Sequence, residues 1–217
     1  TLAVLLVSCR QDDLPDSMPT AHEGYVALRF SADIPAMQEV VTRSVDPDGG
    51  GVQDMTLFCF DSYGLFTTTV EAKVTPTGNG AGLTGNFEAE VPENTRTVHF
   101  LANQNMSEFK EDKFRNKSEA EVMALLEGSS GRMIYWARFT CDPDNDSKID
   151  AQMADKGNTI KMIRNHAQVS IDNPINGWIE VTGFVAYNTN AFGTVAPYHP
   201  EKGFDFEWPG EDDPFVT

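Results

Sequence analysis

The chain has 217 residues, with 33 acidic and 16 basic side chains, a formal net charge of −17 and 40% hydrophobic residues. This length and apolar content suffice for one sizeable domain with its own core, or for one domain and part of a second. The negative charge repels nucleic acid phosphates and anionic lipid head groups, which excludes nucleic acid as an expected partner.

The first feature along the chain is a short apolar run, residues 2–7, that leads to Cys9 and then turns polar. It is too short to cross a bilayer, which takes about 20 apolar residues, and it is typical of the end of a secretory signal peptide. Leu6-Val7-Ser8-Cys9 resembles a bacterial lipobox, in which the cysteine receives a diacylglycerol and becomes the new N-terminus. Cys9 is therefore the expected lipidation site; an ordinary signal peptide cleaved elsewhere, or a buried strand that carries a cysteine, is the alternative.

Residues 10–23 are polar and contain two prolines, which predicts a flexible tether. Its acidic start resembles the tags that direct lipoproteins to the outer surface in Bacteroidetes-type bacteria.

Short segments rich in β-branched and aromatic residues, separated by turn signals, occupy most of the remaining chain. We expect strands at 25–34, 52–60, 65–74, 86–91, 98–103, 133–137, 159–171 and 178–188. One short helix begins at a capping box, Ser118 to Glu121, and is expected to end at Gly128. The pattern predicts a mostly β fold, an antiparallel (transthyretin-like) β-sandwich over residues 24–188, followed at 189–217 by the start of a second β domain or a C-terminal extension.

Residues that could carry catalysis are scattered. The four histidines, His22, His99, His166 and His199, occur singly, and no serine has the context of a nucleophile elbow. We therefore expect neither an enzyme nor a cofactor.

The stretch "DPDNDSKID" is the one place that resembles a metal-binding loop. Four aspartates fall at positions 1, 3, 5 and 9 of a calcium loop: Asp142, Asp144, Asp146 and Asp150. Ser147 and Met153 stand where such a loop needs a glycine and a bidentate glutamate. A solvated acidic turn is favoured, with a weak calcium site as the alternative.

Two cysteines remain once Cys9 is set aside. Cys59 lies within an apolar run, which predicts a buried free thiol. A disulfide between Cys59 and Cys141 is the alternative, and the sequence alone does not place the two sulfurs.

The order of these segments resembles the fimbrillins, lipoprotein-derived pilus subunits of Bacteroidetes. The similarity lies in the lipobox, in the Thr42-Arg43 pair before "SVDPDGGG", in "VQDMTLFCFDSYGLF" and in "FEAEVPENTRTVHFLANQN". "IRNHAQVSI" and "VTGFVAYNTNAFGTVAP" are similar to later parts of the family pattern. A whole fimbrillin has two sandwich domains and a C-terminal donor strand, and by this resemblance we expect the present sequence to include only the start of the second domain.

The resemblance implies a mechanical role. An arginine-specific protease would cut between Arg43 and Ser44, and the first strand would leave a groove that a strand of a neighbouring subunit fills. The core-facing residues lost would be Val26, Leu28 and Phe30, or their neighbours Tyr25 and Ala27. Arg29 lies inside the strand, out of reach of a protease, and a plain solvated loop arginine is the alternative reading of Arg43.

The leading hypothesis is thus a stalk or tip subunit of a bacterial surface fimbria, polymerised with other subunits and tied to the outer membrane through the lipid of its precursor. One alternative is a lipid-retaining fimbrial anchor. Another is a surface lipoprotein that binds glycan or protein through four aromatic residues: Trp136, Trp178, Trp208 and Tyr198. For Trp136 and Trp178 a core or interface position is favoured.

Overall fold

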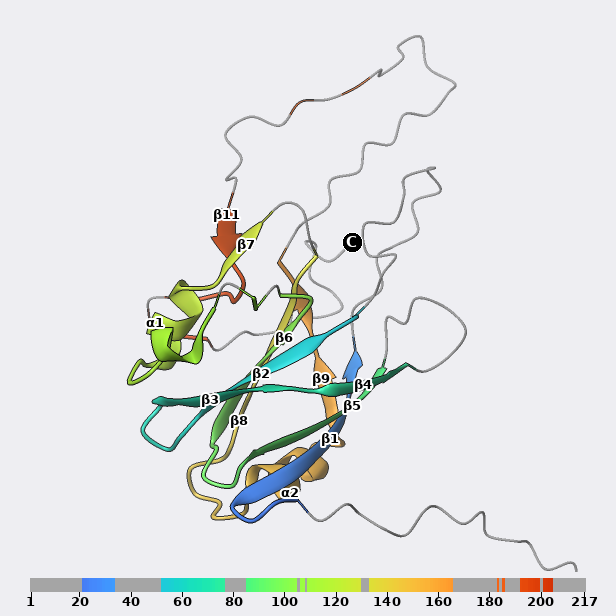
Figure 1. Cartoon of the computed structure of the whole chain (residues 1–217), viewed down its shortest axis with the longest axis vertical. Helices are drawn as coiled ribbons and strands as arrows, with labels where there is room; N and C mark the ends of the chain where they lie inside the picture. Colours follow the sequence, from blue (N-terminus) through green and yellow to red (C-terminus); the bar gives the residue numbers. More distant parts are fainter. Residues whose placement is uncertain are drawn as a thin grey trace, which may run out of the picture.

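A computed structural model describes residues 21–33, 52–76, 85–104, 106–107, 109–129, 133–165, 183, 185, 192–199 and 201–204. Within them, two β-sheets pack face to face (Figure 1). The predicted mostly β fold with packed sheets is confirmed.

The first sheet has the strand order β4-β5-β1-β9, and the second has the order β10-β8-β6-β2-β3. The first sheet contains β1 (Tyr25–Asp33), β4 (Lys73–Pro76), β5 (Gly85–Pro92) and β9 (Thr159–Lys161). The second sheet contains β2 (Met55–Phe60), β3 (Phe66–Glu71), β6 (Thr97–Ala102), β8 (Tyr135–Thr140) and β10 (Ile163–Arg164). A separate pair joins β7 (Glu127–Ser129) to β11 (Phe192–Thr194).

Two expected strands are each divided between the two sheets. The segment expected as one strand at 65–74 forms β3 in the second sheet and β4 in the first, with Ala72 between them. The segment expected at 159–171 forms β9 and β10, separated by Met162, and its remainder lies outside the described residues. In both cases the chain crosses from one sheet to the other, which alternation of apolar residues does not reveal.

The described residues contain two short α-helices where one was expected. The predicted helix, α1 (Glu119–Ala124), begins at the Ser118–Glu121 capping box, but it ends at Leu125, and Gly128 belongs to β7. The second helix, α2 (Ile149–Asp155), is not among the expected elements; only its first two residues belong to the acidic stretch 142–150, for which the sequence favours a turn. It forms because Ile149, Gln152 and Met153 share one buried face.

Among the described strands, all pairings are antiparallel except that of β1 with β9, which is parallel. The long excursion from β8 through α2 brings the chain back in the direction of β1. This pairing departs from a purely antiparallel sandwich.

The core has two parts, one on each side of the second sheet. The first lies between the sheets and includes Val26, Phe87 and Phe100. The second lies on the outer face of the second sheet, under α1 and a segment that includes Val195 and Phe204. Every residue of β2 and β6 is buried, because both faces of these strands are covered.

Candidate functional site

Strand β1, the first of the described strands, is a structural part of the core. The side chains of β1 alternate, so that Val26, Leu28, Phe30 and Ala32 are buried and the residues between them are half-buried or exposed. The Phe30 ring stacks on Phe87 with the centroids 5.3 Å apart and meets Phe100 edge-on at 5.0 Å. The apolar face of β1 therefore occupies pockets that only a strand of the same alternation fills.

The backbone of β1 is held on both sides. Tyr25 to Ser31 pair with β5, from Pro92 to Asn86, and Ser31 to Asp33 pair with β9. On the β9 side, Ser31 N–H donates to the Asn158 carbonyl at 2.8 Å. We call the surroundings of this strand, formed by β5, β9, Phe87 and Phe100, the β1 seat.

Helix α2 closes the sandwich next to the β1 seat. It lies beside β1 at the bottom of Figure 1 and contacts it. Ile149 and Met153 belong to the same core cluster as the buried face of β1. The helix thus forms part of the wall that would surround a vacated groove.

Exposed charges add little to the attachment of β1. Arg29 pairs with Glu88 at 3.2 Å, and both side chains are half exposed. His22 Nδ1 pairs with Glu90, which raises the pKa of the fully exposed imidazole through a hydrogen bond. Exposed pairs of this kind are worth about 0–1 kcal/mol, so burial and backbone pairing hold the strand.

The predicted processing residues lie outside the described residues: Cys9, Arg43 and Ser44. In the sequence, Arg43 stands between the end of β1 and the start of β2. The structure therefore describes the strand that cleavage would release, and the cleavage and lipidation sites stay predictions.

The four aspartates of the candidate calcium loop do not form a cage with other ligands. In the described part of the chain, no three His, Cys, Asp or Glu side chains are grouped so as to hold a metal ion. Asp142 Oδ1 instead accepts the Asp144 N–H at 2.9 Å, as in an Asx turn. Asp150 belongs to the first turn of α2.

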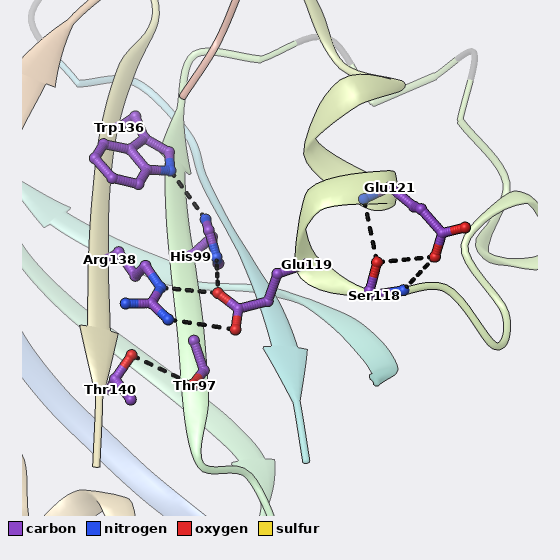
Figure 2. Close-up of polar contacts among 8 residues, drawn as sticks. All are labelled: Thr97, His99, Ser118, Glu119, Glu121, Trp136, Arg138 and Thr140. Carbon is purple, nitrogen blue, oxygen red and sulfur yellow. Dashed lines mark hydrogen bonds and ion pairs between the residues drawn. The ribbon is translucent and has the colours of Figure 1, made fainter. Parts of the chain in front are cut away.

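A partly buried polar network that the sequence did not predict lies between β6, β8 and α1 (Figure 2). Trp136 Nε1–H donates to His99 Nδ1 at 3.0 Å, so the proton of the neutral ring is on Nε2, which donates to Glu119 Oε2 at 2.9 Å. Arg138 Nε donates to the same oxygen at 2.8 Å.

The environment sets the protonation states of this network. Burial lowers the pKa of His99, against the opposing effect of Glu119. Burial alone would raise the pKa of Glu119, but the hydrogen bonds from His99 and Arg138 outweigh it and lower that pKa to about 2.

The network is structural in its geometry. Both ring nitrogens of His99 are occupied, and the ring also meets Phe204 edge-on with the centroids 4.9 Å apart. No nitrogen is left to take a proton from a substrate, so this histidine is not placed as a general base.

The two described cysteines are buried free thiols. Burial raises the pKa of Cys59 to about 12 and also raises that of Cys141. Strand β6 lies between β2, which carries Cys59, and β8, which ends just before Cys141. Adjacent strands are about 4.8 Å apart, so two strand spacings exceed the Cα separation of about 7 Å that a disulfide tolerates.

The aromatic residues considered for ligand binding have different positions. Trp136 is 3% exposed and belongs to the second core cluster, as favoured. Tyr198 is 53% exposed and packs on Phe204 with the ring centroids 5.2 Å apart. Trp178 and Trp208 lie outside the described residues.

Comparisons with known proteins add one similarity. No protein-family model matches the chain, and no curated protein matches its sequence. Among solved structures, the chain is similar to a fimbrial assembly protein from Parabacteroides distasonis, with 11% sequence identity and a TM-score of 0.35. The match covers 64% of this chain and 54% of that chain, so this chain spans about half the length of the protein it matches. A TM-score this low carries no functional weight.

Among the described residues, no helix has the length and apolar character needed to cross a membrane.

Proposed function

We propose that this chain is a stalk or tip subunit of a bacterial surface fimbria, and that it assembles by strand exchange at the β1 seat. The observation that carries the proposal is the position of β1. It is the first of the described strands, Arg43 lies between it and β2 in the sequence, and it contributes four side chains to the core.

Hydrolysis of the Arg43–Ser44 bond would leave β1 attached through non-covalent contacts alone. Its departure would expose the inward edges of β5 and β9 and the rings of Phe87 and Phe100. Unpaired backbone groups and empty apolar pockets together favour the insertion of another extended segment. A strand from a neighbouring subunit with small and large apolar residues at alternate positions fits that requirement.

The precursor in this proposal is exported as a lipoprotein acylated at Cys9 and is located at the outer membrane and cell surface. An arginine-specific protease and other fimbrial subunits are its partners. A lipid-retaining anchor is the same proposal without the cut. The glycan-binding alternative is less favoured, because Trp136 is a core residue.

The first experiment treats the folded chain with an arginine-specific protease and identifies the new N-terminus by mass spectrometry. We expect a terminus at Ser44 and, once fimbrial subunits that carry a donor strand are added, a ladder of oligomers in size-exclusion chromatography. The R43A variant should stay uncut at this position and should not form the ladder. R10A is the matched control, because loss of an arginine ahead of β1 leaves the Arg43 cut intact.

The second experiment tests the seat directly by adding a synthetic peptide of residues 24–33 to the cut protein. We expect an excess of this peptide to refill the seat and suppress the ladder. A peptide with Phe30→Asp should not compete, whereas one with Arg29→Ala should, because Arg29 points to solvent. A folded protein that resists cutting at Arg43 would favour the anchor, and a ladder that ignores the peptide would contradict assembly at the β1 seat.

A further inference from the structure

The β3 edge of the second sheet is blocked by a side chain. The sheet ends at β3, so one side of β3 pairs with β2 and the other side faces no strand within the described residues. An exposed edge offers free backbone N–H and C=O groups to any other strand, and folded proteins usually block such edges.

The sequence of β3 makes this edge a favourable template. It reads Phe-Thr-Thr-Thr-Val-Glu, with β-branched residues from Thr67 to Val70 and no charge before Glu71. Neutral, β-branched segments without proline are those most prone to pair with copies of themselves.

The segment that leads to α1 covers the first part of this edge. Phe66 N–H donates to the Lys117 carbonyl at 2.9 Å, and Leu65 forms an isolated bridge with Ser118. At this end of β3, Lys117 and Ser118 therefore pair with the strand as a neighbouring strand would.

Glu111 covers the middle of the edge. It is the first residue of the 3-10 helix η1 (Glu111–Lys113), and its Oε1 accepts the Thr69 backbone N–H at 3.0 Å. The same oxygen accepts the hydroxyl groups of Thr68 at 2.8 Å and Thr69 at 3.1 Å. These bonds, with the backbone bond first, lower the pKa of Glu111, so the acceptor stays ionised at neutral pH.

The neighbouring edge strand has blocking devices of a different kind. Next to β3, the chain continues as β4, the edge of the first sheet, which begins with Lys73 and ends with Pro76. A charged side chain and a residue without N–H both oppose pairing at an edge. The part of β3 around Thr69 has neither, and Glu111 acts there instead.

We infer that Glu111 is the residue that closes the β3 edge to strand addition by a second copy of this chain. Without its carboxylate, β3 of one molecule would pair antiparallel with β3 of another, which gives a two-fold dimer with a continuous sheet. If the proposed fimbrial function holds, Glu111 also directs an incoming strand to the β1 seat rather than to this edge; that clause rests on the proposed function.

The test uses the uncut full chain with Glu111→Ala and measures self-association by sedimentation over a range of concentrations. Amide hydrogen exchange is followed in a peptide that contains Thr69. At low concentration, where the variant is monomeric, we expect exchange at Thr69 to become about tenfold faster, the equivalent of about 1.4 kcal/mol of lost protection. At higher concentration we expect a dimer to appear and to slow that exchange again. D112A is the matched control: Asp112 neighbours Glu111 in η1, and its ion pair with Arg115 is exposed. It should change neither measurement.

Two further variants test whether the side chain of Glu111 protects Thr69 and whether the dimer forms through β3. E111Q retains the size of the side chain and an acceptor oxygen, and we expect it to fold and to show a smaller increase in exchange, about threefold, corresponding to under 1 kcal/mol. In the double variant E111A/T69K, the added charge on the edge should abolish the dimer.

A folded E111A that stays monomeric would overturn the inference, as would a dimer that persists in E111A/T69K. If E111A fails to fold, unchanged exchange at Thr69 in E111Q would overturn it. The assay needs no protease and no cut at Arg43, so failure of the proposed function leaves this result standing, and failure here leaves the β1 seat untouched.

Discussion

Phe30→Ala is the most direct test of the claim that β1 is a structural part of the core. Phe30 is 3% exposed and lies against the Phe87 and Phe100 rings, which belong to two different sheets. Buried Phe→Ala changes cost about 3–5 kcal/mol. Because strands from both sheets frame the site and limit its collapse, we expect a value near the middle of that range, about 4 kcal/mol.

Arg29→Ala provides the control from the same strand. Its side chain points to solvent, and its ion pair with Glu88 is half exposed, so the loss should be at most about 1 kcal/mol. Since domains are stable by about 5–15 kcal/mol, Phe30→Ala removes a large part of the total and Arg29→Ala a small part.

The assay is urea unfolding of the uncut chain, followed by tryptophan fluorescence, because Trp136 is buried in the fold. For m values of about 1–3 kcal/mol/M, the midpoint should fall by about 1.3–4 M for Phe30→Ala and, at the same m value, by at most a quarter of that shift for Arg29→Ala. Equal losses for the two variants, or a loss below about 1 kcal/mol for Phe30→Ala, would refute the assignment of β1 to the core. The difference between the two stability losses also measures the free energy that a replacement strand must contribute at the position of Phe30.

Three further predictions concern the polar network of His99 and Glu119 and the thiol of Cys59. Glu119→Gln should lower the free energy of unfolding at pH 7 by about 3 kcal/mol. The stabilisation by this carboxylate is fully present above its unfolded pKa and is lost as the pH falls towards about 2. In acid titrations of unfolding, the variant should therefore lose less stability than the unaltered chain. Because the pKa of His99 is lowered in the folded state, the unfolded chain takes up a proton at a higher pH than the folded chain does. The stability should therefore fall as the pH drops below about 6.5. His99→Gln should reduce this fall, as measured by thermal melts at pH 7 and pH 5, and an equal fall in both proteins would contradict the lowered pKa of His99. Cys59 should resist alkylation by iodoacetamide until the protein unfolds, as measured by mass spectrometry, and modification under native conditions would show that its strand opens locally.

Local patterns predicted most of the strand positions. The alternation at 25–34 and 86–91 corresponds to β1 and β5, and the Ser118–Glu121 capping box does begin a helix. These features depend on residues close together in the sequence, which is why the sequence alone predicts them.

The features that the sequence did not predict depend on tertiary contacts. No pattern marks Ala72 or Met162 as points where a strand passes between sheets. Helix α2 has a short, acidic sequence, and its helical state depends on burial of Ile149 and Met153 against the core. The only sequence signal for α2 was the i, i+3, i+4 spacing of its buried residues.

The candidate site was predictable in part. The sequence left open whether Val26, Leu28 and Phe30 or their neighbours Tyr25 and Ala27 face the core, and the structure buries the first three. The polar network was not predictable, because His99, Glu119 and Arg138 come from separate elements, and no local pattern links them. The same holds for Glu111, whose partners are more than 40 positions away in the sequence.

The parallel pairing of β1 with β9 has a consequence for how the chain folds. It joins Ser31 to Thr159, which are 128 positions apart, whereas the pairs of β2 with β3 lie within one hairpin. Contacts this distant in sequence form late and slow the folding of a domain, because the intervening chain has to be ordered first. During synthesis from the N-terminus, β1 is made long before β9, so it cannot complete its pairing until the chain has been made as far as Lys161. We therefore expect the β2–β3 hairpin, whose strands follow each other closely in the sequence, to form before the pairing of β1 with β9.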